Sequence, residues 1–135
     1  MSNLIERLNP ILLLLARFGS SSMMMVHGFH KWEKLVAGGE IKFFDFIGMG
    51  PTVTLVLTIL AELVAPVLII VGLWTRYASA LIAFTMFIAA FVVHAGDPLE
   101  DREASLTYLI LFLLLMVTGA GRFSIDARMA TKKAD

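Results

Sequence analysis

The 135-residue chain contains no cysteine, and only 16% of its residues are charged. The missing cysteine excludes disulfides, thiolate catalysis and c-type haem attachment on this chain, and it leaves the redox compartment undetermined. Eleven Lys and Arg residues balance eleven Asp and Glu residues, so the chain lacks the basic surplus typical of nucleic-acid-binding domains. The opening MSNLIERLNP also lacks the positive region and cleavage site of a secretory signal, which predicts an uncleaved first helix.

Apolar residues dominate instead, because they make up 59% of the chain and give it a mean hydropathy of +0.84. A soluble domain of this length would leave much apolar surface exposed to water, whereas a bilayer removes that problem. Four apolar runs are too long for strands and show no period of two, so they predict helices. Spanning a bilayer needs about 20 residues, with a lower limit near 17, and the fourth run reaches this only with its polar flanks. The four runs are 10–29, 52–74, 77–94 and 104–120.

These runs predict an all-α membrane protein, with a single domain over 1–135 folded as a four-helix transmembrane bundle. Short links between the later runs make neighbouring helices antiparallel. Four spans place both termini on one side of the membrane, and the Lys and Arg bias of the loops favours the cytoplasm for that side. The Phe-rich stretch at about 40–50 predicts an interfacial or re-entrant segment, with an irregular, mobile loop as the alternative.

Two charged residues, Arg17 and Glu62, fall inside the apolar runs. Either charge alone would cost at least about 2.5–3.5 kcal/mol at the centre of a bilayer, and pairing reduces that cost. We therefore predict an ion pair between Arg17 and Glu62. The alternative is that Arg17 extends to the inner headgroups while Glu62 stays protonated. A second predicted pair, Arg76 with Asp126, would be exposed and worth about 0–1 kcal/mol.

Other polar residues gather at the predicted outer ends of the helices, and three interpretations stay open. They are ordinary solvated helix ends, a pocket for an anionic or quinone-like ligand, or a metal or haem site. His27 and His94 are the candidate metal ligands, although no compact ligand motif supports that interpretation. The candidate ligand-binding residues are Arg17, His27, Lys31, Glu62, His94 and Glu103.

Three motifs, taken in order, resemble the DoxX family of small four-helix bacterial membrane proteins. They are HG-x-x-K within HGFHK (27–31), E-x(9)-G-L-x-T-R (62–76) and G-x-G-R-[FY]-S-I-D (119–126), and the resemblance covers nearly the whole chain. His30 departs from the usual family pattern. Carried over position by position, the resemblance marks these polar residues: Arg17, His27, Lys31, Glu62, Arg76, His94, Glu103 and Asp126.

The resemblance implies a multi-pass protein of the bacterial inner membrane. The family name comes from a small subunit of a thiosulfate:quinone oxidoreductase, and other members are linked to membrane oxidoreductase assemblies and oxidative-stress defence. We expect a non-catalytic or accessory subunit of a redox assembly that binds quinone or docks an oxidoreductase partner. The alternatives are a small proton or solute transporter and a non-catalytic membrane anchor. The sequence favours quinone over haem as a cofactor and leaves a homo-oligomer open.

Overall fold

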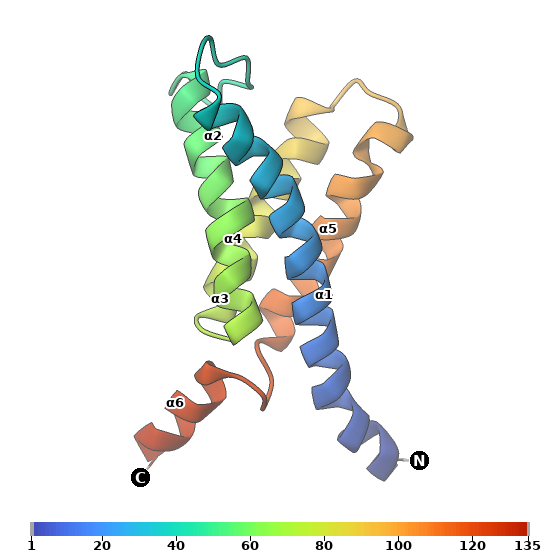
Figure 1. Ribbon diagram of the computed structural model, residues 1–135. Helices are drawn as coiled ribbons and strands as arrows, with labels where there is room; N and C mark the ends of the chain where they lie inside the picture. Colours follow the sequence, from blue (N-terminus) through green and yellow to red (C-terminus); the bar gives the residue numbers. More distant parts are fainter. Residues whose placement is uncertain (1, 135) are drawn as a thin grey trace.

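The structure is a computed structural model that describes residues 2–134, and these residues form helices joined by turns and loops (Figure 1). The elements are α1 (Ser2–Val36), α2 (Pro51–Ile59), η1 (Leu60–Val64), α3 (Ala65–Val71), α4 (Thr75–Ile88), η2 (Ala89–Val93), α5 (Leu99–Thr118) and α6 (Ile125–Ala134). Two five-residue π-helical segments, η1 and η2, interrupt the helices: η1 joins α2 to α3, and η2 continues α4.

Three of the described helices are long and apolar enough to cross a membrane: Asn3–Val36, Pro51–Val71 and Thr75–Val93. They confirm the prediction of an all-helical protein with several membrane spans. α5 is less apolar, because its first turns carry Glu100, Asp101 and Glu103.

The first helix extends beyond the predicted run 10–29 at both ends, since hydropathy marks the apolar part of a helix and misses its polar ends. Pro10, the first residue of the predicted run 10–29, lies inside α1. Its ring removes the N–H that would otherwise bond to the carbonyl of Glu6. α5 likewise begins at Leu99, ahead of the predicted 104, and α6 was not predicted.

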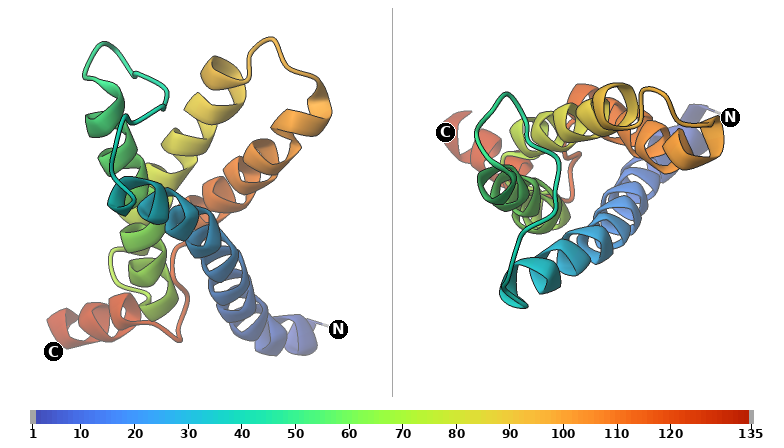
Figure 2. Two further views of the ribbon diagram at one scale, coloured as in Figure 1. Left: turned by 45° about the horizontal axis from the view of Figure 1, so that its top comes forward. Right: turned by 90° about the horizontal axis from the view of Figure 1, so that it is seen from above.

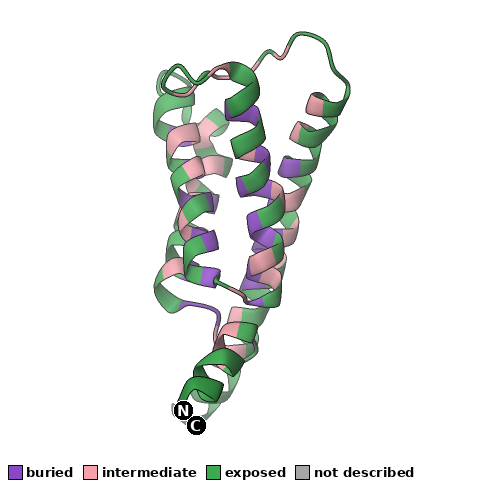
Figure 3. Cartoon of the chain, turned by 90° about the vertical axis from the view of Figure 1, so that its left-hand side faces the viewer, coloured by how far each residue is buried: buried purple, intermediate pink, exposed green. Residues whose placement is uncertain are grey.

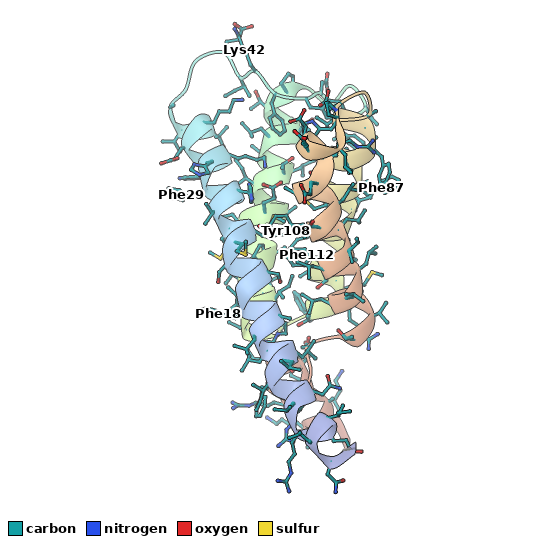
Figure 4. All side chains as sticks on the ribbon, turned by 90° about the vertical axis from the view of Figure 1, so that its right-hand side faces the viewer. Phe18, Phe29, Lys42, Phe87, Tyr108 and Phe112 are labelled. Carbon is teal, nitrogen blue, oxygen red and sulfur yellow. The ribbon has the colours of Figure 1, made fainter. Side chains whose placement is uncertain are left out.

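The helices surround a core that lies between α1, α3, α4 and α5. α1 crosses the other helices obliquely (Figure 2), and both ends of the chain lie at the same end of the molecule (Figure 1). Buried residues face the interior and exposed residues face outward (Figure 3). Phe112 is fully buried, whereas Phe18 and Phe29 of α1 and Phe87 of α4 point outward (Figure 4). Apolar side chains on the outer face are what a lipid surround requires.

The segment after α5 is fixed to the turn between α3 and α4. The Asp126 carboxylate accepts hydrogen bonds from the backbone N–H groups of Trp74 (2.8 Å) and Thr75 (3.0 Å), and so satisfies donors at the start of α4. The Asp126 N–H donates to the carbonyl of Gly72 at 2.8 Å. The predicted Arg76–Asp126 ion pair is therefore wrong, because backbone N–H groups occupy the carboxylate while Arg76 lies beside Gly119.

Candidate functional site

A buried ion pair between Lys31 of α1 and Glu62 of η1 lies at the centre of the candidate site. Lys31 Nζ donates directly to a carboxylate oxygen of Glu62. The Glu62 side chain is only 2% exposed, and the Lys31 side chain is 27% exposed. Both residues were candidates from the sequence, but the structure joins them to each other. Removing either partner from such a buried pair leaves an uncompensated charge, at a typical cost of about 3–5 kcal/mol.

Arg17 has other partners, so the predicted Arg17–Glu62 ion pair is wrong. The guanidinium is 1% exposed and donates to four backbone carbonyls. Two of them, Ile69 (3.0 Å) and Ile70 (2.8 Å), belong to the last turn of α3, where carbonyls lack partners within the helix. The other two, Ala120 (2.6 Å) and Phe123 (2.9 Å), belong to the segment between α5 and α6. Arg17 therefore ties three parts of the chain together and lines neither cavity of the candidate site described below.

The direction of helical side chains explains this choice of partners. Side chains on an α-helix lean toward its N-terminus. α1 runs in the opposite direction to the continuous helix formed by α2, η1 and α3. Arg17 therefore leans toward the end of α3 and away from Glu62. Lys31 leans back toward Glu62, while Glu62 leans toward Lys31. Arg17 is level with Ile69 and Ile70, seven to eight residues from Glu62, which corresponds to roughly 11 Å of helix rise.

A proline and a glycine shape the backbone around Glu62. Pro66 has no N–H to donate to the Glu62 carbonyl four residues earlier, and a π-helical turn occurs where the regular pattern is interrupted. α1 approaches this carbonyl at Gly28, where an added Cβ would lie 2.6 Å from the Glu62 oxygen. The HG-x-x-K motif therefore places glycine at the helix contact and Lys31 one turn further on, beside the carboxylate.

A large apolar cavity of about 560 Å³ opens on one side of the pair. The segment between α1 and α2 contributes Phe43, Phe44 and Phe46, and α4 contributes Phe84. Phe46 and Phe84 make an edge-to-face contact with ring centres 6.2 Å apart. Lys31, Glu62 and Lys42 supply charge to this wall, which apolar side chains otherwise dominate.

The Phe-rich segment that covers this cavity is fixed to the helices at both ends. Lys34 Nζ donates to the Lys42 carbonyl at 2.6 Å, and the Phe46 N–H donates to Thr54 Oγ1 at 3.1 Å. The Asp45 carboxylate accepts from the Gly50 N–H at 2.8 Å, just before α2 begins. The segment passes from α1 to α2 across the end of the molecule opposite the termini (Figure 2).

A smaller, more polar cavity of about 140 Å³ lies on the other side of the pair. Lys31 and Glu62 line it together with His27, His94 and Tyr108. His27 meets Tyr108 edge to face, with ring centres 5.5 Å apart, and Tyr108 points into the interior from α5 (Figure 4). The sequence analysis did not include Tyr108 among the candidates. Its position in an apolar run was the one available indication, because a buried tyrosine hydroxyl usually needs a polar partner.

The remaining candidates divide between this cavity and the surface. His94 Nδ1 lies 2.6 Å from a carboxylate oxygen of Asp97, in the turn after η2. Glu103 is exposed and does not line the cavity, so its predicted place in the pocket is wrong; the next two residues, Ala104 and Ser105, line it instead. His30 is exposed and lies 3.4 Å from Glu33. Among residues 2–134, no three His, Asp or Glu side chains gather in a way that could hold a metal ion.

Apolar helices that span the membrane several times, around a buried ion pair between two cavities, define a multi-pass membrane protein. Residues 12–95 match the DoxX family, and the chain belongs to that family. The match includes Arg17, Lys31 and Glu62, together with the whole wall of the large cavity.

Two curated proteins resemble the chain along most of its length. An uncharacterized protein of Haemophilus influenzae is 29% identical over 98% of this chain and 100% of that protein. The inner membrane protein YphA of Escherichia coli is 26% identical over 88% of this chain and 91% of that protein. These relationships and the three apolar helices place the chain in the bacterial inner membrane. No solved structure matches the chain.

Proposed function

We propose that this protein is the membrane subunit of a redox assembly and that it binds a quinone-like ligand in the large cavity. The observation that carries the proposal is the position of the Lys31–Glu62 pair in the walls of both cavities. One cavity is apolar and lined by four phenylalanines, and the other carries two histidines and a tyrosine. The pair therefore lies where an apolar environment meets a polar one.

The chemistry of the cavity suits an amphipathic ligand. Ligand pockets are typically apolar, with a few polar groups that fix orientation. A quinone has an apolar tail and carbonyl oxygens, and Lys31 can donate a hydrogen bond to such an oxygen. Glu62 holds the ammonium in place and can accept a proton. When bound, a quinone would supply two-electron, two-proton chemistry.

His27, Tyr108 and His94 extend the polar side of the site from the pair toward the turn after η2. Histidine exchanges protons readily near neutral pH. Asp97 orients the His94 ring, as carboxylates commonly do for histidines at proton-transfer sites. These groups provide a route by which a proton reaches or leaves Glu62.

Quinone binding tests this function directly. Decylubiquinone would be titrated into the purified full-length protein in detergent, and binding followed by isothermal titration calorimetry. We expect wild type to bind and Lys31→Met to bind at least tenfold more weakly. Arg7→Met is the matched control, since Arg7 lies on the same helix, is exposed and lines neither cavity. Equal binding by wild type and Lys31→Met, or no binding by either, contradicts the proposal.

Transport of a proton or small solute is the second candidate function, favoured because the Lys31–Glu62 pair lies between two cavities. A proton passing from one cavity to the other would meet this pair. Proton flux into liposomes containing wild type or Glu62→Gln measures this function. Equal flux in both, at the level of empty liposomes, excludes it.

The proposal includes a membrane topology. We assign α5 as a fourth span, because it packs along α4 for most of its length and Tyr108, Phe112 and Leu115 are buried within the molecule. We assign both termini to the cytoplasm, because their end of the molecule carries most of the Lys and Arg residues near the spans. Those residues are Arg7, Arg76, Arg122, Arg128, Lys132 and Lys133.

A further inference from the structure

A groove with both apolar and basic walls lies at the end of the molecule that carries both termini. Its volume is about 410 Å³. Leu14 of α1 and Val71 of α3 form an apolar wall, and the segment that leads into α6 adds Phe123 and Ile125. Two guanidinium groups, those of Arg122 and Arg128, complete the lining. The groove is separate from the Lys31–Glu62 site, which shares none of these residues.

The two arginines lack an anionic partner in the part of the chain that the structure describes. No carboxylate of residues 2–134 lies within 4.0 Å of either guanidinium. Arg122 rests over the ring of Phe123, 5.1 Å from the ring centre, and both arginines are exposed. Two arginines that line one groove without a carboxylate partner suit a phosphate, because guanidinium groups bind phosphate oxygens through several donors.

The apolar wall shows which kind of phosphate compound the groove would take. Leu14 and Val71 belong to helices that are long and apolar enough to span the membrane, so they face acyl chains. A ligand that contacts both walls must have an anionic head at the membrane surface and an apolar tail within the bilayer. A soluble phosphate compound or an acidic peptide would make no apolar contact with Leu14 and Val71.

α6 supports a position at the membrane surface. It projects away from the other helices at the end where both termini lie (Figure 1). Ile125 and Met129 lie four residues apart on one face, and each is 40% exposed. Arg128 and Lys132 flank this apolar stripe at helical spacing. An apolar stripe bordered by basic residues is typical of helices that lie in the headgroup region.

We propose that this groove is a binding site for an anionic phospholipid. The phosphate lies between Arg122 and Arg128, and an acyl chain follows Leu14 and Val71 between α1 and α3. Ile125 and Met129 of α6 dip into the same leaflet. Basic pockets between membrane helices bind anionic lipid headgroups in this way.

Native mass spectrometry of the purified full-length protein in detergent tests the site. The probes are dioleoyl phosphatidylglycerol and dioleoyl phosphatidylcholine, which share acyl chains and differ in headgroup charge. We expect wild type to retain the anionic lipid preferentially and Arg122→Gln/Arg128→Gln to bind it about 30-fold more weakly, or about 2 kcal/mol at about 1 kcal/mol per basic residue. The control is Arg7→Gln/Lys133→Gln, which removes two exposed charges from the same end of the molecule outside the groove and should change binding less than threefold.

Four results would overturn the site. Equal retention of both lipids by wild type removes the headgroup preference. Equal losses in the arginine double variant and in the Arg7→Gln/Lys133→Gln control indicate diffuse charge attraction without a built groove. Displacement of the lipid by millimolar inorganic phosphate shows that the arginines bind phosphate alone. Thermal unfolding of each variant checks the fold, and Arg122→Lys/Arg128→Lys, which keeps both charges, should bind within tenfold of wild type; a complete loss there also counts against the site.

Discussion

At the scale of single residues, the two cations that α1 directs into the bundle have different roles. Arg17 satisfies four backbone carbonyls and touches no ligand cavity of the candidate site, whereas Lys31 contacts Glu62 in the walls of both cavities. The sequence identified Arg17 and Glu62 as unusual charges and Lys31 as a candidate ligand-binding residue. It could not pair them correctly, because depth estimates along a helix ignore which way each side chain leans and which backbone carbonyls a turn leaves free.

Arg17→Lys should destabilise the protein although it keeps the charge. An ammonium group has three donors in a compact head and cannot reach the four carbonyls that surround the guanidinium. Leaving buried carbonyls unsatisfied costs about 1–3 kcal/mol each, so we expect a loss of about 3 kcal/mol or more in the free energy of unfolding. Unfolding in mixed detergent micelles measures the loss. Arg7→Lys, an exposed change on the same helix, serves as control, and equal stability of the two variants would refute the role given to Arg17.

The Lys31–Glu62 pair should show strong coupling in a double-mutant cycle. Lys31→Met leaves the buried Glu62 carboxylate without a partner and should lower the free energy of unfolding by about 3–5 kcal/mol, whereas Glu62→Leu leaves a partly exposed ammonium and should cost less. The double variant removes both charges and should recover most of that loss, because a buried pair replaced by apolar residues is often neutral. Additive losses in the same micelle assay would show that the two side chains do not interact.

At the scale of elements, the two π-helical segments and one glycine define how the helices meet around the site. The sequence predicted the helices from hydropathy, but it gave no sign of η2 and only a proline near η1. A π-helical turn contains one residue more than an α-helical turn, and the hydropathy of a run does not show where that extra residue lies. The helix ends were missed for a similar reason, since polar residues such as Lys34 and Glu100 continue a helix outside the apolar run.

Gly28→Ala tests the contact between α1 and η1. A Cβ at this position would lie 2.6 Å from the Glu62 carbonyl oxygen. That oxygen belongs to the backbone of η1, so it cannot move away without shifting the helix. We expect a loss of about 1–3 kcal/mol in the free energy of unfolding, as for other overpacked sites, together with weaker decylubiquinone binding.

Gly19→Ala is the matched control for that variant, because it changes the same residue type on the same helix. An added Cβ there has no neighbour within 4 Å. Alanine is the better helix former by about 1 kcal/mol, so stability should stay the same or rise. If Gly28→Ala behaves like Gly19→Ala, the close approach of α1 to η1 is not a constraint on the protein.

At the scale of the whole molecule, the two ends of the bundle differ in character. The end near the Phe-rich segment holds the candidate ligand site, and the end with both termini holds the basic groove and α6. Family, helical class and membrane location followed from composition and three motifs. α6 did not, because its short, polar sequence has no hydropathy signal, and its position depends on contacts of Asp126 with a turn far away in the chain.

The proposed topology can be measured because the chain has no cysteine of its own. Single variants Asn3→Cys, Gly96→Cys and Ala130→Cys would be treated with a membrane-impermeant maleimide. In intact spheroplasts we expect labelling at Gly96→Cys alone, and in inverted membrane vesicles at Asn3→Cys and Ala130→Cys. Labelling of Asn3→Cys and Ala130→Cys from opposite sides would show that α5 does not cross the membrane.

The carbonyl contacts of Arg17 also bear on how the protein is made. The Phe123 carbonyl lies 106 residues after Arg17, so the first span leaves the ribosome long before its cation has all of its partners. Until the last segment emerges, that helix carries an incompletely solvated charge that disfavours a settled position in lipid. We therefore expect the first helix to reach its final position only after the segment between α5 and α6 is made, and a chain truncated before Ala120 to hold that helix loosely.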